Sequence, residues 1–187
     1  MNSQSLQYTA RRKPDRTARI IADGRHHENL HYDFSEFFLL EQGTVLENLF
    51  DYWSRQEGAV PAKFSPEIDM PEFGSAVTAC LNVTASDPMD FWMNKHRVCE
   101  KTGRGADISG QPIKGLSWLN YAAALSSEYN LCRHTGVPDY SEVHQRIDGI
   151  ESHFTRLMLP ISRNPSERVT DIFVCVSHLR ENMRIET

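Results

Sequence analysis

The segment spanning residues 46–63 (LENLFDYWSRQEGAVPAK) constrains the fold most, because it joins an aromatic helix face to a defined stop. Apolar residues here recur every three or four positions and so share one face of a helix: Val45, Leu46, Leu49, Phe50 and Trp53. Thr44 followed by Glu47 has the spacing of a capping box, which predicts the start of the helix. Gly58 suits the left-handed position after a helix, and Pro61 prevents it from resuming. None of these residues is chemically reactive, so the segment indicates a binding fold more than a catalytic one.

Further elements follow along the chain. Alternating polar and apolar residues predict two strands at 77–84 and 90–98, and four glycines and a proline predict turns at 100–115. Ser117 then has the character of an N-cap for a long helix that ends at Gly136 and Pro138. Three closing strands are expected at about 141–148, 153–162 and 169–179, the last two joined by a turn around Asn164 and Pro165.

This order predicts an α+β fold, with a five-stranded antiparallel sheet that carries helices on one face. A chain of 187 residues with 40% apolar content can bury one core better than two. We therefore expect one domain at 44–179, an N-terminal extension at 1–43 and a short tail at 180–187.

The N-terminal extension divides into a basic part and an apolar part. Over the first twenty-five residues, two acidic residues, Asp15 and Asp23, oppose six cations: Arg11, Arg12, Lys13, Arg16, Arg19 and Arg25. We interpret this part as a solvated tail, with contact to phosphate or to an acidic partner as the alternative. Residues 30–40 (LHYDFSEFFLL) are apolar and aromatic, which predicts a helical extension that packs on its own domain or forms a dimer interface.

Composition excludes several classes of protein. The net charge of -5 argues against general nucleic-acid binding. No apolar run approaches twenty residues and the N-terminus lacks the order of a signal peptide, so we expect no membrane span and a cytoplasmic protein. The cysteines lack Cys-x-x-Cys spacing, which favours reduced and buried thiols: Cys80, Cys99, Cys132 and Cys175.

Four stretches in order resemble a bacterial PAS-domain subfamily of usually single-domain proteins of unknown function. The helix at 46–63 is similar to the opening helix of that subfamily, which ends in a Tyr-Trp pair before a Pro-Ala-Arg/Lys bend. The other stretches are 105–110 (GADISG), 129–138 (YNLCRHTGVP) and 154–162 (FTRLMLPIS). The chain departs from the subfamily at Lys95, His96 and Arg97, where a Gly-Thr pair is common. This departure weakens the inference that the chain shares the ligand of the subfamily more than the inference that it shares the fold.

The resemblance implies a ligand cavity between the sheet and the helices. It places six residues at or near the cavity, each with core packing as its alternative: Trp92, Trp118, Tyr121, Leu125, Phe154 and Leu157. We expect a non-enzymatic sensory domain that binds a small molecule or a protein partner and signals through contact or through a homodimer formed by its N-terminal segment. The alternatives are a structural adaptor with a filled cavity and a small enzyme that uses a Cys/His pair.

The sequence contains only weak motifs for catalysis and for metal or cofactor binding, so no catalytic residue, metal ligand or cofactor is assigned. Among His26, His27 and His31, the pair His27 and His31 has the i, i+4 spacing that would let it share a metal ion if the segment were helical. No third ligand is evident in the sequence. His96 with Cys99 and Cys132 with His134 are thiol and imidazole neighbours without an orienting third group. Haem on His134 or His144 lacks a supporting motif, and the flavin-binding PAS motif is not present.

Overall fold

The computed structural model describes residues 14–55, 77–87, 90–98, 109–147, 149–161 and 169–178. Its elements in chain order are β1 (Arg16–Ala22), β2 (Arg25–Tyr32), α1 (Phe34–Leu40), α2 (Val45–Ser54), β3 (Val77–Asp87), β4 (Asp90–Val98), the 3-10 turn η2 (Ile113–Gly115), α3 (Leu119–Thr135), β5 (Asp139–Ile147), β6 (Ile150–Ile161) and β7 (Asp171–His178). The predicted helix stop at Gly58 and Pro61 and the turn at Asn164 and Pro165 lie outside the described residues.

All strands form one antiparallel sheet in the order β1-β2-β5-β6-β7-β3-β4. The α+β class and the antiparallel sheet are therefore confirmed. The five expected strands, β3 to β7, form a continuous part of this sheet, and β1 and β2 add two more at the edge of β5.

The basic N-terminal segment differs from the expected tail, because residues 16–32 form a hairpin within the same sheet. Asp23 and Gly24 turn the chain with positive φ angles of 54° and 72°, a geometry that Asp-Gly pairs favour in two-residue hairpins. Strand β2 was not predicted from the sequence, because it buries polar side chains, among them His27, Asn29 and His31. The expected boundary near residue 43 thus separates no structural units in the described part of the chain.

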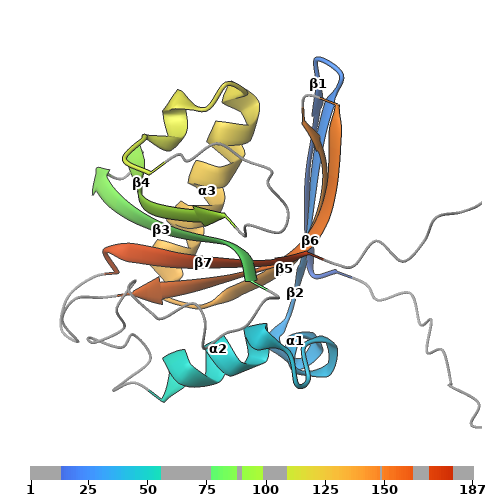
Figure 1. Cartoon of the computed structure of the whole chain (residues 1–187), viewed down its shortest axis with the longest axis vertical. Coiled ribbons are helices and arrows are strands. Elements are labelled where there is room, and N and C mark those ends of the chain that lie inside the picture. The colour runs from blue at the N-terminus through green and yellow to red at the C-terminus, as the bar shows by residue number, and fades with distance from the viewer. Residues whose placement is uncertain are drawn as a thin grey trace, which may run out of the picture.

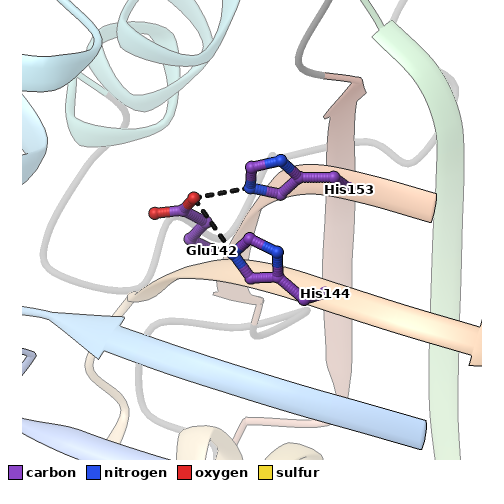
Figure 2. Close-up of side chains that lie close together, drawn as sticks. All are labelled: Glu142, His144 and His153. Carbon is purple, nitrogen blue, oxygen red and sulfur yellow. Dashed lines mark hydrogen bonds and ion pairs between the residues drawn. The ribbon is translucent and has the colours of Figure 1, made fainter. Parts of the chain in front are cut away.

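A second long hairpin joins β5 to β6. Gly149, with φ of 78°, lies in its turn, and His144 is paired directly with His153 across the two strands. Residues two apart on one strand share a face, so Glu142 lies on the same side as both histidines, as Figure 2 shows.

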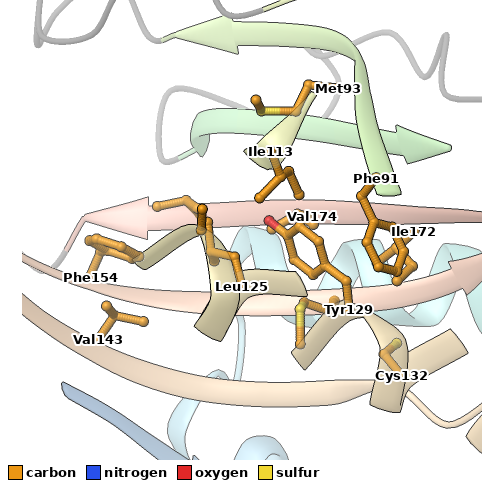
Figure 3. Packing of buried hydrophobic residues seen from close by; sticks show 13 residues of the cluster. Phe91, Met93, Ile113, Leu125, Tyr129, Cys132, Val143, Phe154, Ile172 and Val174 are labelled. Carbon is orange, nitrogen blue, oxygen red and sulfur yellow. The ribbon is translucent and has the colours of Figure 1, made fainter. Parts of the chain in front are cut away.

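Helices cover both faces of the sheet, which corrects the expectation of helices on one face. Figure 1 shows α1 and α2 on one side and α3 on the other. The first side buries an apolar cluster: Phe37, Val45, Leu46, Leu49, Trp53, Tyr140, Leu157, Leu159, Ile161, Phe173 and Cys175. The second side buries another, drawn in Figure 3: Phe91, Met93, Ile113, Ala122, Leu125, Tyr129, Cys132, Val143, Phe154, Met158, Ile172, Val174 and Val176.

The start of α2 and the end of α3 agree with the predictions from the sequence, whereas the start of α3 differs by one residue. The Thr44 hydroxyl accepts a hydrogen bond from the Glu47 amide at 3.4 Å, which confirms the predicted start of α2. Trp53 belongs to the core, and its indole donates to the carbonyl of Pro160 at 3.0 Å. For α3 the N-cap is Trp118 and not Ser117, and no side chain caps this end. Gly136 closes α3 in the left-handed conformation, as predicted.

The apolar segment at 30–40 packs largely on its own sheet. Phe37 is fully buried, and Phe34 and Leu40 pack against the α1/α2 cluster. Phe38 and Leu39 remain exposed. Within the described part of the chain, none of the helices has the length and apolar character needed to cross a bilayer.

Candidate functional site

Polar side chains replace apolar ones on the α3 side of β2, β5 and β6. His31 pairs with Ser141 and Ser141 with Arg156, so these three residues form one row across the strands. Each of them is at most 4% exposed. Asn29, also fully buried, lies in the next row of the sheet, beside Val143. Such a face is unusual, because charged residues are almost never fully buried unless they are paired.

The partner of this row is Glu128, which projects from the middle of α3. Its carboxylate accepts hydrogen bonds from Asn29 Nδ2 at 2.5 Å and from Arg156 Nη2 at 2.7 Å. His31 Nε2 lies 3.6 Å from the same carboxylate. Burial by itself would raise the pKa of Glu128, but the Arg156 charge and these hydrogen bonds outweigh it and hold the pKa well below its usual range. Glu128 is therefore a fixed negative charge that ties α3 to the sheet.

The network continues from Glu128 towards the surface through His31. The other ring nitrogen of His31, Nδ1, lies 2.9 Å from Asp139 Oδ1, and Arg16 forms an ion pair with the same carboxylate at 3.4 Å. Burial lowers the pKa of His31, but its contacts with Asp139 and Glu128 outweigh burial, so the net shift is upward. His31 thus bridges two carboxylates, which favours its charged form.

At the N-terminal end of α3 the polar face becomes aromatic. Tyr121 meets the ring of His27 edge-on with 4.9 Å between ring centroids, and it stacks on Trp118 at 5.9 Å. The Arg25 guanidinium lies 6.0 Å from the centre of the Trp118 ring. Burial lowers the pKa of His27 to about 4, so its imidazole is neutral at pH 7. Because His27 Nδ1 faces Gln145 Oε1 at 3.4 Å and donates to it, Nε2 remains as an acceptor.

Several buried polar atoms on this face have no hydrogen-bond partner among the described residues. They are His27 Nε2, Asn29 Oδ1, Trp118 Nε1, Ser141 Oγ and Arg156 Nε. Native proteins leave few buried polar atoms unpaired, and each such atom usually marks a bound water, an ion or a ligand. The face between α3 and the sheet is therefore the strongest candidate for a binding site in the described part of the chain.

The structure brings four of the six expected ligand residues to this side of the sheet: Trp118, Tyr121, Leu125 and Phe154. Leu157 does not belong with them, because it belongs to the cluster under α1 and α2 on the opposite face. Trp92 does not belong with them either. Its neighbours Phe91 and Met93 point into the α3 cluster, so Trp92 points away from it, and its side chain is 39% exposed. Both corrections have one cause, because neighbouring residues of a strand point to opposite faces.

Sequence reasoning missed the polar residues at the centre of the site. His27, Asn29 and His31 alternate with a period of two, the spacing of one strand face, but their polarity masked the signal. Glu128 falls three positions after Leu125, on the buried face of the helix, where a carboxylate signals a buried partner. Its partner, Arg156, is a cation directly before the apolar run 157–161 of β6.

Two alternative sites considered from the sequence are not assembled, and a third, the His96 and Cys99 pair, lies outside the residues whose side chains the structure describes. His27 and His31 lie on a strand and not on a helix, so the spacing that would let them share a metal is absent. Cys132 donates to the carbonyl of Val137 at 3.4 Å, while His134 Nδ1 faces the carbonyl of Asn130 at 2.8 Å. Burial raises the pKa of the Cys132 thiol, so these two residues form no activated pair.

Comparison with known proteins gives no relative for this geometry. No protein-family model, no curated protein and no solved structure matches the chain.

Proposed function

We propose that this chain is a non-enzymatic sensory domain with a PAS-like fold, which binds a small, neutral, polar molecule between α3 and β2. The observation that carries the proposal is the set of buried polar atoms on this face without a hydrogen-bond partner among the described residues. Leaving such an atom unpaired costs about 1 to 3 kcal/mol. A bound polar molecule supplies the missing partners and offsets this cost.

The chemistry of the ligand follows from the groups around Tyr121. His27 Nε2 offers an acceptor and Trp118 Nε1 a donor, and both rings contact the ring of Tyr121. A ligand there needs one donor, one acceptor and a flat surface, as in an amide or a nitrogen heterocycle. A neutral molecule fits best, because His27 is uncharged and the charges of Glu128 and Arg156 already compensate each other.

The fold supports a sensory role because α3 takes part in both the aromatic end and the charged centre. Strands β3 to β7 with α3 on one face are compatible with a PAS-like arrangement. A ligand that moves Trp118 or Tyr121 acts on the same helix that holds Glu128 against Asn29 and Arg156. Ligand binding would shift the protein between two states only if the ligand binds them unequally.

Binding can be measured with Trp118 as the only tryptophan. The chain has three tryptophans, so a Trp53→Phe/Trp92→Phe variant isolates the fluorescence of Trp118. Native mass spectrometry of the freshly purified full chain should show a retained small molecule, and the Trp118 signal should change on titration with neutral amides and nitrogen heterocycles. Absence of both results would contradict the proposal and favour an adaptor with a filled interior.

Two substitutions test the predicted contacts. Trp118→Phe removes the indole donor but keeps an aromatic ring, and His27→Phe removes the acceptor. Each substitution should weaken ligand affinity by roughly tenfold, which corresponds to the free energy of one hydrogen bond. For these variants the readout is a thermal shift, since Trp118→Phe removes the reporter. Trp92→Phe is the matched control, because Trp92 is exposed and points away from the α3 cluster. Equal losses in all three variants would show that the contacts are not specific.

The signal is proposed to pass to a partner protein or through a homodimer. Phe38 and Leu39 on α1 are exposed by 42% and 72%, so a second copy can reach these two apolar side chains of the segment 30–40. Deleting residues 1–43 is no clean test, because it removes β2 and with it Asn29 and His31.

A point substitution tests the dimer instead. Leu39→Glu should lower the mass measured by sedimentation velocity, while Leu131→Glu, at an exposed leucine of α3, should not. A monomeric parent, or a dimer that survives Leu39→Glu, would remove dimerisation through α1 from the proposal.

A further inference from the structure

The β5–β6 hairpin carries a second group of polar side chains, on the face opposite the α3 cluster. Glu142 and His144 lie two residues apart on β5, and His153 is the direct cross-strand partner of His144 on β6. Each residue directs one ligand atom to a common point, and these atoms all lie within 4.8 Å of one another. Figure 2 shows both imidazole rings turned towards the Glu142 carboxylate.

Both histidines use the same nitrogen towards the same oxygen. His144 Nε2 lies 3.2 Å and His153 Nε2 lies 2.5 Å from Glu142 Oε1. The two rings are stacked with 3.7 Å between their centroids. Both imidazole Nε2 atoms and one carboxylate oxygen are therefore directed at one another on a single face of the hairpin.

We propose that Glu142, His144 and His153 form a binding site for a divalent first-row transition-metal ion, with Zn²⁺ as the representative ion. Two imidazoles and one carboxylate are a ligand set that Zn²⁺ and its neighbours prefer over Mg²⁺ or Ca²⁺. Ligand bonds of about 2.0 to 2.2 Å place tetrahedral ligand atoms roughly 3.3 Å apart. The separation of 3.2 Å between His144 Nε2 and Glu142 Oε1 already matches this spacing, and the His153 contact has only to open.

The surroundings of the site suit metal entry and hold the carboxylate. The three side chains are partly exposed, with 27% for Glu142, 37% for His144 and 42% for His153, so an ion can arrive from solvent. The Tyr32 hydroxyl donates to the other carboxylate oxygen, Glu142 Oε2, at 3.2 Å. This hydrogen bond leaves Oε1 directed at the histidines. In metal sites, hydrogen bonds from neighbouring groups orient the ligands in the same way. Three protein ligands leave at least one coordination position open to water.

Isothermal titration of the full chain with Zn²⁺, after removal of metals with a chelator, tests the site. We expect one ion bound per chain through this cluster. His144→Gln, His153→Gln and Glu142→Gln should each weaken that binding by more than about tenfold, and Tyr32→Phe by a smaller factor, within the range known for groups behind metal ligands. His134→Gln is the matched control, because His134 is an exposed histidine outside the cluster.

A second measurement separates this site from any thiolate site. Co²⁺ bound by nitrogen and oxygen ligands gives visible absorption without the thiolate charge-transfer band, and His144→Gln should abolish the visible signal. Circular dichroism confirms that each variant is folded. The proposal is overturned if the chain binds no Zn²⁺, or if His144→Gln and His153→Gln bind it as tightly as the parent. In that outcome the three residues are an ion-pair cluster only.

Discussion

Acidification below about pH 6.5 should destabilise this protein through His27. His27 is 1% exposed and contacts Tyr121, and burial, aided by the Arg156 and His26 charges, lowers its pKa from 6.5 to about 4 despite the opposing effects of Glu128 and Gln145. The unfolded chain therefore binds a proton at this histidine more readily than the folded chain. The stability that neutral His27 contributes is complete above about pH 6.5 and is lost as the pH falls towards about 4.

The size of the effect follows from the two pKa values. A difference of about 2.5 pKa units corresponds to roughly 3 kcal/mol, lost at up to about 1.4 kcal/mol for each pH unit. Glu128 does not interfere in the upper part of this range, because its pKa is held below the ordinary value of 4.5 in the fold. The raised pKa of His31 also leaves its contribution intact below about pH 6.5.

Urea unfolding at several pH values between about 6.5 and 5 measures this slope. The parent should lose stability steeply over this interval, whereas His27→Gln, which cannot be protonated, should lose at least half of the slope. His134→Gln, at an exposed histidine of α3, should keep the slope of the parent. Parallel slopes in the parent and in His27→Gln would show that His27 is not the source of the pH dependence, whatever the absolute stability of the variant.

Further expected outcomes concern the charged network and the α2 core. Raising the pH above about 6.5 should lower the free energy of unfolding. Contacts with Asp139 and Glu128 outweigh burial and raise the pKa of His31, so the stability that protonated His31 contributes is lost as it releases its proton; His31→Asn should lack this fall in urea titrations. Glu128→Leu should lower the free energy of unfolding by about 3 to 5 kcal/mol, because it leaves Arg156 charged and unpaired. Adding Arg156→Met should recover part of that loss. If the losses of the two single variants simply add in the double variant, the two residues are not paired. Trp53→Ala should cost about 3 to 5 kcal/mol in the same assay, and a cost below 1 kcal/mol would show that the α2 face is not core.

Elements whose signals lie within a few residues of one another could be predicted from the sequence. The spacing from Val45 to Trp53 and the Thr44–Glu47 cap define α2, and Gly136 defines the end of α3, because periodicity and capping are local properties. Alternation located β3 to β7 closely, and with them the α+β class and the antiparallel sheet. The same local rules failed for β2, since a strand that buries histidines and an asparagine does not alternate in hydrophobicity.

Which of these residues come into contact depends on the tertiary structure and cannot be predicted from local patterns. Asn29 and Glu128 are 99 positions apart and Glu128 and Arg156 are 28 apart, so no window of sequence contains their contacts. The faces of Trp92 and Leu157, and the pairing of His144 with His153, depend on strand register, where a shift of one residue reverses every side chain. A buried charge is stable only beside a partner that the fold supplies, so Glu128 and Arg156 became part of one site only when the fold brought α3 against the sheet.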